Sequence, residues 1–158
     1  MSVALDLSVF KQNYLVSGLS DEQVGQIAAL ATVETFLAGE TVTRIGEDNA
    51  DLYVILDGRV NVLTADGDKL GEAGPGSVLG EIGLIDARPR TANTVTVGLT
   101  RAARLPAREL RSLMNGNRDL GFVVLANLAR VLCGRLRMAN ARLDELIDKT
   151  TDAWEHAY

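Results

Sequence analysis

The sequence predicts an α+β chain: an antiparallel β jelly roll (a double-stranded β-helix) with N-terminal helices before it and a long C-terminal helix after it. Two observations lead to this fold class. Between residues 32 and 105, short segments rich in β-branched residues alternate with glycine-containing turns. From about Arg118 to Lys149, apolar residues recur every three or four positions, which is helical spacing. We divide the chain into an N-terminal helical segment (1–31), the jelly roll (32–106), C-terminal helices (107–149) and a tail (150–158).

The N-terminal segment carries one clear helix signal. Ser20 can cap a helix, with Gln23 reaching back to complete a capping box. The apolar residues that follow predict a helix over about 21–31. Between Val3 and Lys11 the apolar residues alternate and then crowd together, which leaves an extended arm and a short helix both open.

The strand segments follow from turn chemistry and side-chain alternation. Asp57-Gly58 is a strong hairpin signal, and the continuous apolar run Leu52–Leu56 is typical of a buried strand. The expected strands cover residues 32–37, 41–45, 52–56, 59–64, 69–73, 77–79, 91–97 and 100–105. A jelly roll of this kind leaves room for a ligand at the wall of its concave sheet.

Beyond Pro106 the pattern becomes helical. A short helix is expected to end at Asn115-Gly116, and a long one to follow over residues 118–149. The stripe of apolar residues along this long helix is longer than one small domain needs to bury. We therefore predict a parallel two-fold homodimer through the distal half of the helix. The four-residue steps predict local unwinding of the supercoil, and an intramolecular docking helix remains the alternative. The stripe consists of Leu125, Leu128, Leu132, Leu136, Ala139, Leu143 and Leu146.

Composition excludes several classes of function. The formal net charge of −5 disfavours a DNA-binding surface. The nearest basic cluster is Arg101, Arg104, Arg108 and Arg111, whose spacing would put most of them on one helix face; this favours a solvated face over the alternative, a polyanion site. No apolar run is long enough to span a membrane, and the N-terminus does not resemble a signal peptide.

The cysteine and histidine content narrows the chemistry further. The single cysteine, Cys133, permits no internal disulfide, which fits a cytoplasmic protein, and its helical position favours a packed residue over a reactive thiol. With His156 as the only histidine, we expect no catalytic triad and no histidine-rich metal site. We therefore predict neither an enzyme nor a metal- or cofactor-dependent protein.

The stretch Gly74–Ala92, GPGSVLGEIGLIDARPRTA, carries the functional signal. Its glycines allow backbone N–H groups to approach a ligand, and Arg90 offers a planar cation that matches two phosphate oxygens. Glu81 would repel a phosphate unless it held a donor of its own, such as a sugar hydroxyl. The combination indicates a nucleotide. A plain tight turn is the alternative, and a dinucleotide fingerprint is disfavoured because the glycine spacing is one residue too long and no long helix follows.

The segments Gly80–Ile85 and Pro89–Ala92 resemble the phosphate-binding cassette of the cyclic nucleotide-binding domain family, which includes catabolite-activator-like effector domains. The resemblance covers about Tyr14 to Asp144 and includes Gly39-Glu40, Gly46-Glu47, Asp51–Leu56 and Gly58. Leu79 departs from it, because the family commonly has an aromatic residue there. The resemblance implies that Arg90 binds the cyclic phosphate and Glu81 the ribose 2′-hydroxyl, with backbone contacts from Gly80 and Ile82 and a phosphate or base contact from Thr91.

The same resemblance implies that the C-terminal helix covers the nucleotide, and we place Arg135 and Leu136 at the positions that face its base. For Arg135, a merely exposed helical arginine is an equally open alternative. The ligand would be cAMP or cGMP; a threonine after the arginine can favour cGMP in relatives, whereas stand-alone bacterial-type domains more often bind cAMP, which we favour. The candidate ligand-binding residues are Gly80, Glu81, Ile82, Gly83, Arg90, Thr91, Ala92, Arg135 and Leu136.

The resemblance also bears on output. Because only Thr150–Tyr158 follows the long helix, we expect a stand-alone sensor that signals to an unknown protein partner and not to DNA. Trp154 and Tyr158 are the candidate contacts, and a disordered tail is the equal alternative. The alternative is a structural dimerisation or scaffold module whose jelly roll no longer binds nucleotide.

Overall fold

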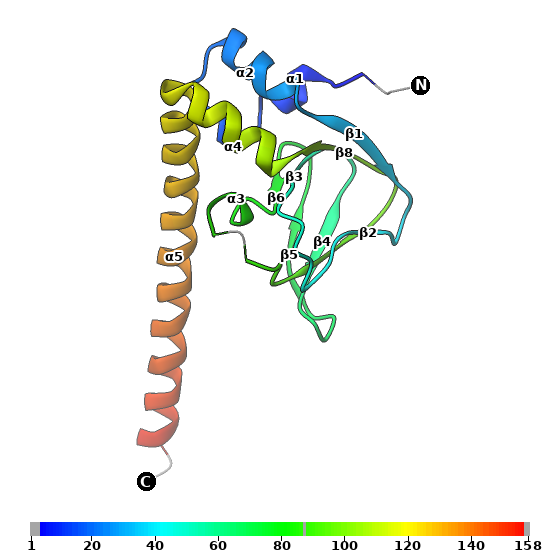
Figure 1. The fold of residues 1–158 in the computed structure, drawn as a ribbon. Coiled ribbons are helices and arrows are strands. Elements are labelled where there is room, and N and C mark those ends of the chain that lie inside the picture. Colours follow the sequence, from blue (N-terminus) through cyan, green and yellow to red (C-terminus); the bar gives the residue numbers. More distant parts are fainter. Residues whose placement is uncertain (1–3, 87, 157–158) are drawn as a thin grey trace.

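A computed structural model describes residues 4–86 and 88–156. Two four-stranded antiparallel sheets face each other, helices gather at one end, and one long helix runs alongside (Figure 1). The strand orders are β1-β8-β3-β6 and β2-β7-β4-β5, so the predicted jelly roll is confirmed. The strands are β1 Thr32–Phe36, β2 Thr41–Thr43, β3 Leu52–Asp57, β4 Val60–Leu63, β5 Lys69–Ala73, β6 Val78–Leu79, β7 Asn93–Thr96 and β8 Thr100–Leu105.

The strand β3 lies at the centre of its sheet. It pairs with β8 from Leu52 opposite Leu105 onward, and with β6 through Tyr53 opposite Leu79. Its residues 52–56 are all buried, as the continuous apolar run predicts. Asp57-Gly58 turns the chain from β3 into β4, and Gly58 there has a positive φ of 90°. The short strand β6 then delivers the chain to the cassette.

The described part of the N-terminal segment, from residue 4 onward, forms three short helices: α1 (Leu7–Phe10), the 3-10 helix η1 (Tyr14–Val16) and α2 (Asp21–Ala28). The capping box is present, with Ser20 Oγ accepting from Gln23 N at 3.2 Å and Gln23 Oε1 accepting from Ser20 N at 3.0 Å. The undecided stretch therefore contains a helix, although its first residue, Val3, lies outside the described residues. The helix α2 ends at Ala28, earlier than the predicted Ala31.

The helices α4 (Ala107–Gly116) and α5 (Arg118–Glu155) complete the core. The first turns of α5 pack against α4 and η1, where Leu120, Val124 and Leu128 are buried. Asn127 donates hydrogen bonds from Nδ2 to the carbonyls of Leu15 at 2.9 Å and Ser17 at 2.8 Å. These bonds attach η1 to α5, so the N-terminal segment and the long helix form one packed unit.

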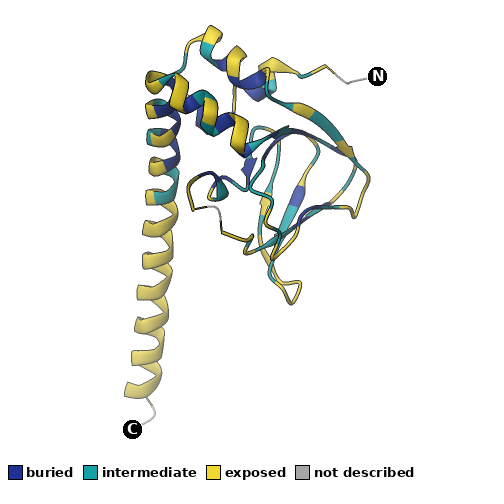
Figure 2. Cartoon of the chain, in the orientation of Figure 1, coloured by how far each residue is buried: buried dark blue, intermediate teal, exposed yellow. Residues whose placement is uncertain are grey.

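The distal part of α5 has no covering within the chain. Every described residue from 133 onward is exposed, as Figure 2 shows along this helix. Cys133 is among them, so the prediction of a packed cysteine was wrong, because the helix has left the core by that turn. The helix also continues past Lys149 to Glu155, which shortens the predicted tail, and Tyr158 lies outside the described residues.

The arginines at 101, 104, 108 and 111 do not share a helix face, which corrects the prediction. Arg101 and Arg104 lie on β8, whereas Arg108 and Arg111 lie on α4, because Pro106 separates the strand from the helix. Across residues 4–86 and 88–156, no helix is both long enough and apolar enough to cross a membrane.

Candidate functional site

A cavity of about 810 Å³ opens between the jelly roll, the cassette and α5. Its volume suits a small-molecule ligand. The cassette forms one wall, strands β4 and β5 contribute to another, and α5 contributes Val131 and Arg135. Tyr14 of η1 also lines it. The site therefore draws on the N-terminal segment, the sheets and the long helix.

Gly80 begins the cassette directly after β6. Its φ of +79° is one that L side chains rarely adopt. A Cβ at this position would overlap the guanidinium of Arg90 and lie 3.1 Å from the Asp51 carbonyl oxygen. Glycine is required here because the arginine side chain lies across the backbone.

The guanidinium of Arg90 is buried inside the cavity wall. Its side chain is only 8% exposed, and Nη2 donates a hydrogen bond to the backbone carbonyl of Asp51. Nε lies 3.8 Å from Glu47 Oε2, an ion-pair distance too long for a hydrogen bond. Among the described residues, no atom accepts a hydrogen bond from Nε. A buried cation with an unused donor is suited to an anionic ligand.

Asp51 holds the carbonyl that receives Arg90. Its carboxylate accepts hydrogen bonds from Arg104 Nε at 2.8 Å and from the backbone N–H of Ala107 at 3.1 Å. The hydrogen bond that Arg104 donates to the Asp51 carboxylate raises the pKa of Arg104. Arg90 is thus connected through Asp51 to the start of α4. Sequence reasoning missed this role, because a carboxylate before a strand gives no local signal of a partner 53 residues away.

Glu81 places a buried carboxylate in the cavity wall. The residue is 4% exposed, and its Oε1 forms an ion pair with Nη1 of Arg135 on α5. The next residues form the single turn α3 (Gly83–Asp86), which Leu84 anchors in the core. An anionic and a cationic side chain, both largely removed from water, therefore face one cavity, and α5 already contacts the anionic one.

Eight of the nine candidate residues line this cavity. Leu136 does not, and its side chain is 62% exposed. Val131 lines the cavity instead, because it lies one helical turn before Arg135 and shares its face, whereas Leu136 is rotated by about 100°. Arg135 is ion-paired with Glu81, and this contact was not part of the prediction. The eight are Gly80, Glu81, Ile82, Gly83, Arg90, Thr91, Ala92 and Arg135.

Comparison with known proteins gives relatives of several kinds. A CRP-like cAMP-activated global transcriptional regulator of Mycobacterium tuberculosis is 34% identical over 116 residues, which are 71% of this chain and 50% of that protein. Glutaminase 1 of Bradyrhizobium diazoefficiens is 26% identical over 132 residues, 84% of this chain but 21% of the enzyme. The chain thus spans half or less of the length of these relatives.

The fold and the family agree with the geometry of the site. The crystal structure of the Thermus thermophilus catabolite activator protein matches with a TM-score of 0.74 and 30% identity, covering 85% of this chain and 63% of that one. Residues 33–117 match the family model of the cyclic nucleotide-binding domain, over more than half of the chain. That segment includes the whole cassette and both buried charges. The chain therefore belongs to the cyclic nucleotide-binding domain family.

Proposed function

We propose that this protein is a cyclic nucleotide sensor that favours cAMP over cGMP and passes ligand-induced movement of α5 to a protein partner. The observation that carries the proposal is the buried guanidinium of Arg90, whose Nε lacks an acceptor among the described residues, in the same cavity as buried Glu81. The preference for cAMP draws on the name of the Mycobacterium tuberculosis relative, which is described as cAMP-activated.

In the proposed complex, the Arg90 side chain and the backbone of Gly80 and Ile82 bind the cyclic phosphate. Glu81 accepts a hydrogen bond from the ribose 2′-hydroxyl. Thr91 and Ala92 follow the arginine in the cavity lining, and Thr91 contacts the phosphate or the base. The remaining oxygen lone pairs of Glu81 are available to the ribose, because a carboxylate has about four acceptor sites and Arg135 takes up only part of them. Val131 and Arg135 present α5 to the base.

The proposed signal follows from this contact between ligand and helix. A ligand moves α5 only to the extent that it binds one helix position more tightly than another. Arg135 supplies such a difference, since its partner Glu81 is the group that also receives the ribose. A cytoplasmic location fits the proposal because the lone cysteine allows no internal disulfide. With a net charge of −5, we propose a protein partner for α5 and not DNA.

Calorimetric titration with cAMP and with cGMP tests the proposed ligand. We expect saturable heat with a 1:1 stoichiometry per chain for cAMP and weaker binding of cGMP. Tighter cGMP binding would reverse the preference while leaving the site intact. No heat from either nucleotide would instead favour the alternative, a dimerisation or scaffold module that retains the jelly roll.

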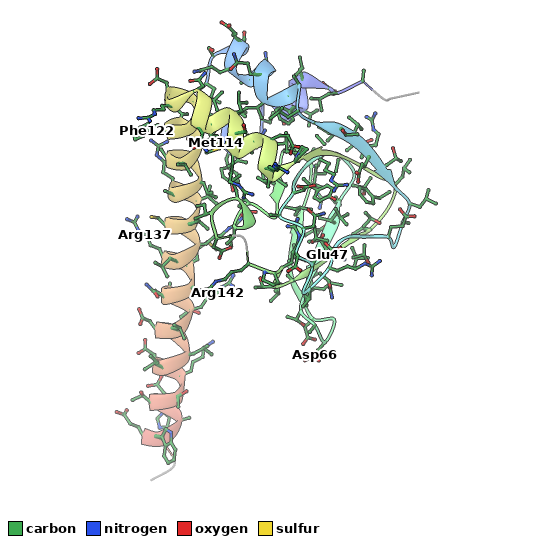
Figure 3. All side chains as sticks on the ribbon, viewed as in Figure 1. Glu47, Asp66, Met114, Phe122, Arg137 and Arg142 are labelled. Atoms are coloured by element: carbon green, nitrogen blue, oxygen red, sulfur yellow. The ribbon has the colours of Figure 1, made fainter. Side chains whose placement is uncertain are left out.

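We also propose that the distal half of α5 pairs with the same helix of a second copy in a parallel homodimer. Leu136, Leu143 and Leu146 are each more than half exposed, and their spacing continues the helical stripe. The proximal part of the stripe is different, since Leu128 is buried in the chain's own core. Phe122 and Arg137 project from the side of α5 that turns away from the sheets (Figure 3).

Sedimentation equilibrium at tens of micromolar tests the dimer, with and without nucleotide. We expect a dimer for the native chain and a monomer for Leu143→Glu, because a buried carboxylate pair at the seam is strongly unfavourable. Leu99→Glu is the matched control, since Leu99 is 63% exposed in the turn between β7 and β8 and is not part of α5. A native chain that remains monomeric under both conditions contradicts the dimer.

A further inference from the structure

Tyr14 places an unused polar group in the cavity. Its ring lines the cavity together with Glu81 and Arg135, although it comes from η1, far earlier in the chain. The hydroxyl oxygen is buried, and among the described residues no atom forms a hydrogen bond with it. Buried hydroxyls nearly always have a partner, because an unmet donor destabilises the fold.

The backbone around Tyr14 is held firmly. Asn13 Oδ1 accepts a hydrogen bond from Leu15 N at 3.0 Å, and its Nδ2 donates to the Phe10 carbonyl at 2.6 Å. Asn127 of α5 donates to the Leu15 carbonyl on the other side. Since residues before and after Tyr14 are fixed, the ring is presented to the cavity by a rigid support.

The chemistry of the hydroxyl makes it a hydrogen-bond donor. Burial raises the pKa of Tyr14, the charge of Glu81 raises it further, and Arg135 opposes them. The phenol therefore keeps its proton at neutral pH and needs an acceptor. A ribose hydroxyl that donates to Glu81 still has lone pairs, so it can accept from a second group beside the carboxylate.

We propose that the Tyr14 hydroxyl donates a hydrogen bond to the oxygen of the ribose 2′-hydroxyl, while that hydroxyl donates its own proton in a hydrogen bond to Glu81. This makes the N-terminal segment part of the nucleotide site. This inference rests on the proposed function and extends it. The pair Glu81 and Tyr14 then recognises both the proton and the lone pair of one hydroxyl. The site thereby distinguishes a ribose from a 2′-deoxyribose more sharply than a carboxylate alone.

A four-way binding comparison tests the inference. Calorimetry measures cAMP and 2′-deoxy-cAMP against the native chain and Tyr14→Phe. We expect Tyr14→Phe to weaken cAMP binding about threefold to tenfold, the usual effect of one hydrogen bond. Its affinity for 2′-deoxy-cAMP should stay within about twofold of the native value, because that ligand lacks the acceptor. The ratio of the affinities for cAMP and 2′-deoxy-cAMP is therefore expected to be smaller in Tyr14→Phe than in the native chain.

Tyr53→Phe is the matched control, because Tyr53 is a buried tyrosine on β3 that does not line the cavity. It should preserve the native discrimination. Equal losses for both ligands in Tyr14→Phe, or no loss for either, overturn the inference while leaving the proposed function standing. A native chain that binds neither nucleotide overturns both, so the two failures are distinguishable.

Discussion

Replacing Arg90 by alanine is expected to weaken cAMP binding by about 30-fold to several thousandfold. Removing one partner of a buried charged pair typically costs about 2 to 5 kcal/mol, and every 1.4 kcal/mol is about tenfold in affinity. Arg90 is the only buried cation among the described residues that line the cavity. Without it, the ligand phosphate would bind in a cavity that has no buried positive charge among those residues. Calorimetric titration of the variant with cAMP measures the loss directly.

Arg44→Ala provides the matched control for Arg90→Ala. Arg44 is exposed and does not line the cavity, so its removal changes only the long-range potential. We expect its affinity for cAMP to change by less than about threefold. Near-native binding by Arg90→Ala, in a variant that melts as one cooperative transition, would refute the phosphate role of this side chain.

Replacing Gly80 by alanine is expected to lower both stability and nucleotide affinity. An L residue in the left-handed region costs about 1 to 2 kcal/mol in strain. At Gly80 the added methyl also overlaps Arg90, so the guanidinium must move away from the Asp51 carbonyl that holds it. We expect binding of cAMP to weaken by about tenfold or more, since even a small displacement of a positioning group is costly.

Gly67→Ala separates backbone strain from displacement of the arginine. Gly67 has a similar φ of 86°, but an added Cβ there meets no atom within 4 Å. Thermal denaturation should show that backbone strain lowers the stability of both variants by a comparable amount. Gly80→Ala should lose further stability because of the overlap with Arg90. Titration should show near-native affinity only in Gly67→Ala. Equal affinities in the two variants would mean that the close contact between Gly80 and Arg90 is not needed for binding.

The parts of the fold that depend on local chemistry could be predicted from the sequence. β5 and β8 have the predicted bounds, and the capping box of Ser20 forms as expected, because turn residues and caps act within a few positions. The cassette was equally predictable, since Gly80, Glu81 and Arg90 belong to one continuous stretch. These residues line one cavity because a single loop carries them.

Features that depend on distant packing could not be predicted. The helical period of α5 was evident from the sequence, but the face that meets the cavity depends on how the helix docks. The sequence therefore predicted Leu136 as a lining residue, whereas the structure has Val131 there. The four arginines around Pro106 have helical spacing in the sequence, although two of them lie on strand β8 and two on helix α4. The contact of Arg135 with Glu81, and the presence of Tyr14 beside them, join segments that no local pattern relates.

In the proposed sensor, the length of α5 sets the size of the movement at its far end. From Arg135, where the helix touches the cassette, to Glu155 the rise is about 30 Å at 1.5 Å per residue. A tilt of about 10° at Arg135 therefore displaces the far end by roughly 5 Å, nearly the pitch of one turn. In the proposed sensor, a small change in the tilt of α5 at Glu81 would thus become a displacement of several ångströms at a surface remote from the nucleotide.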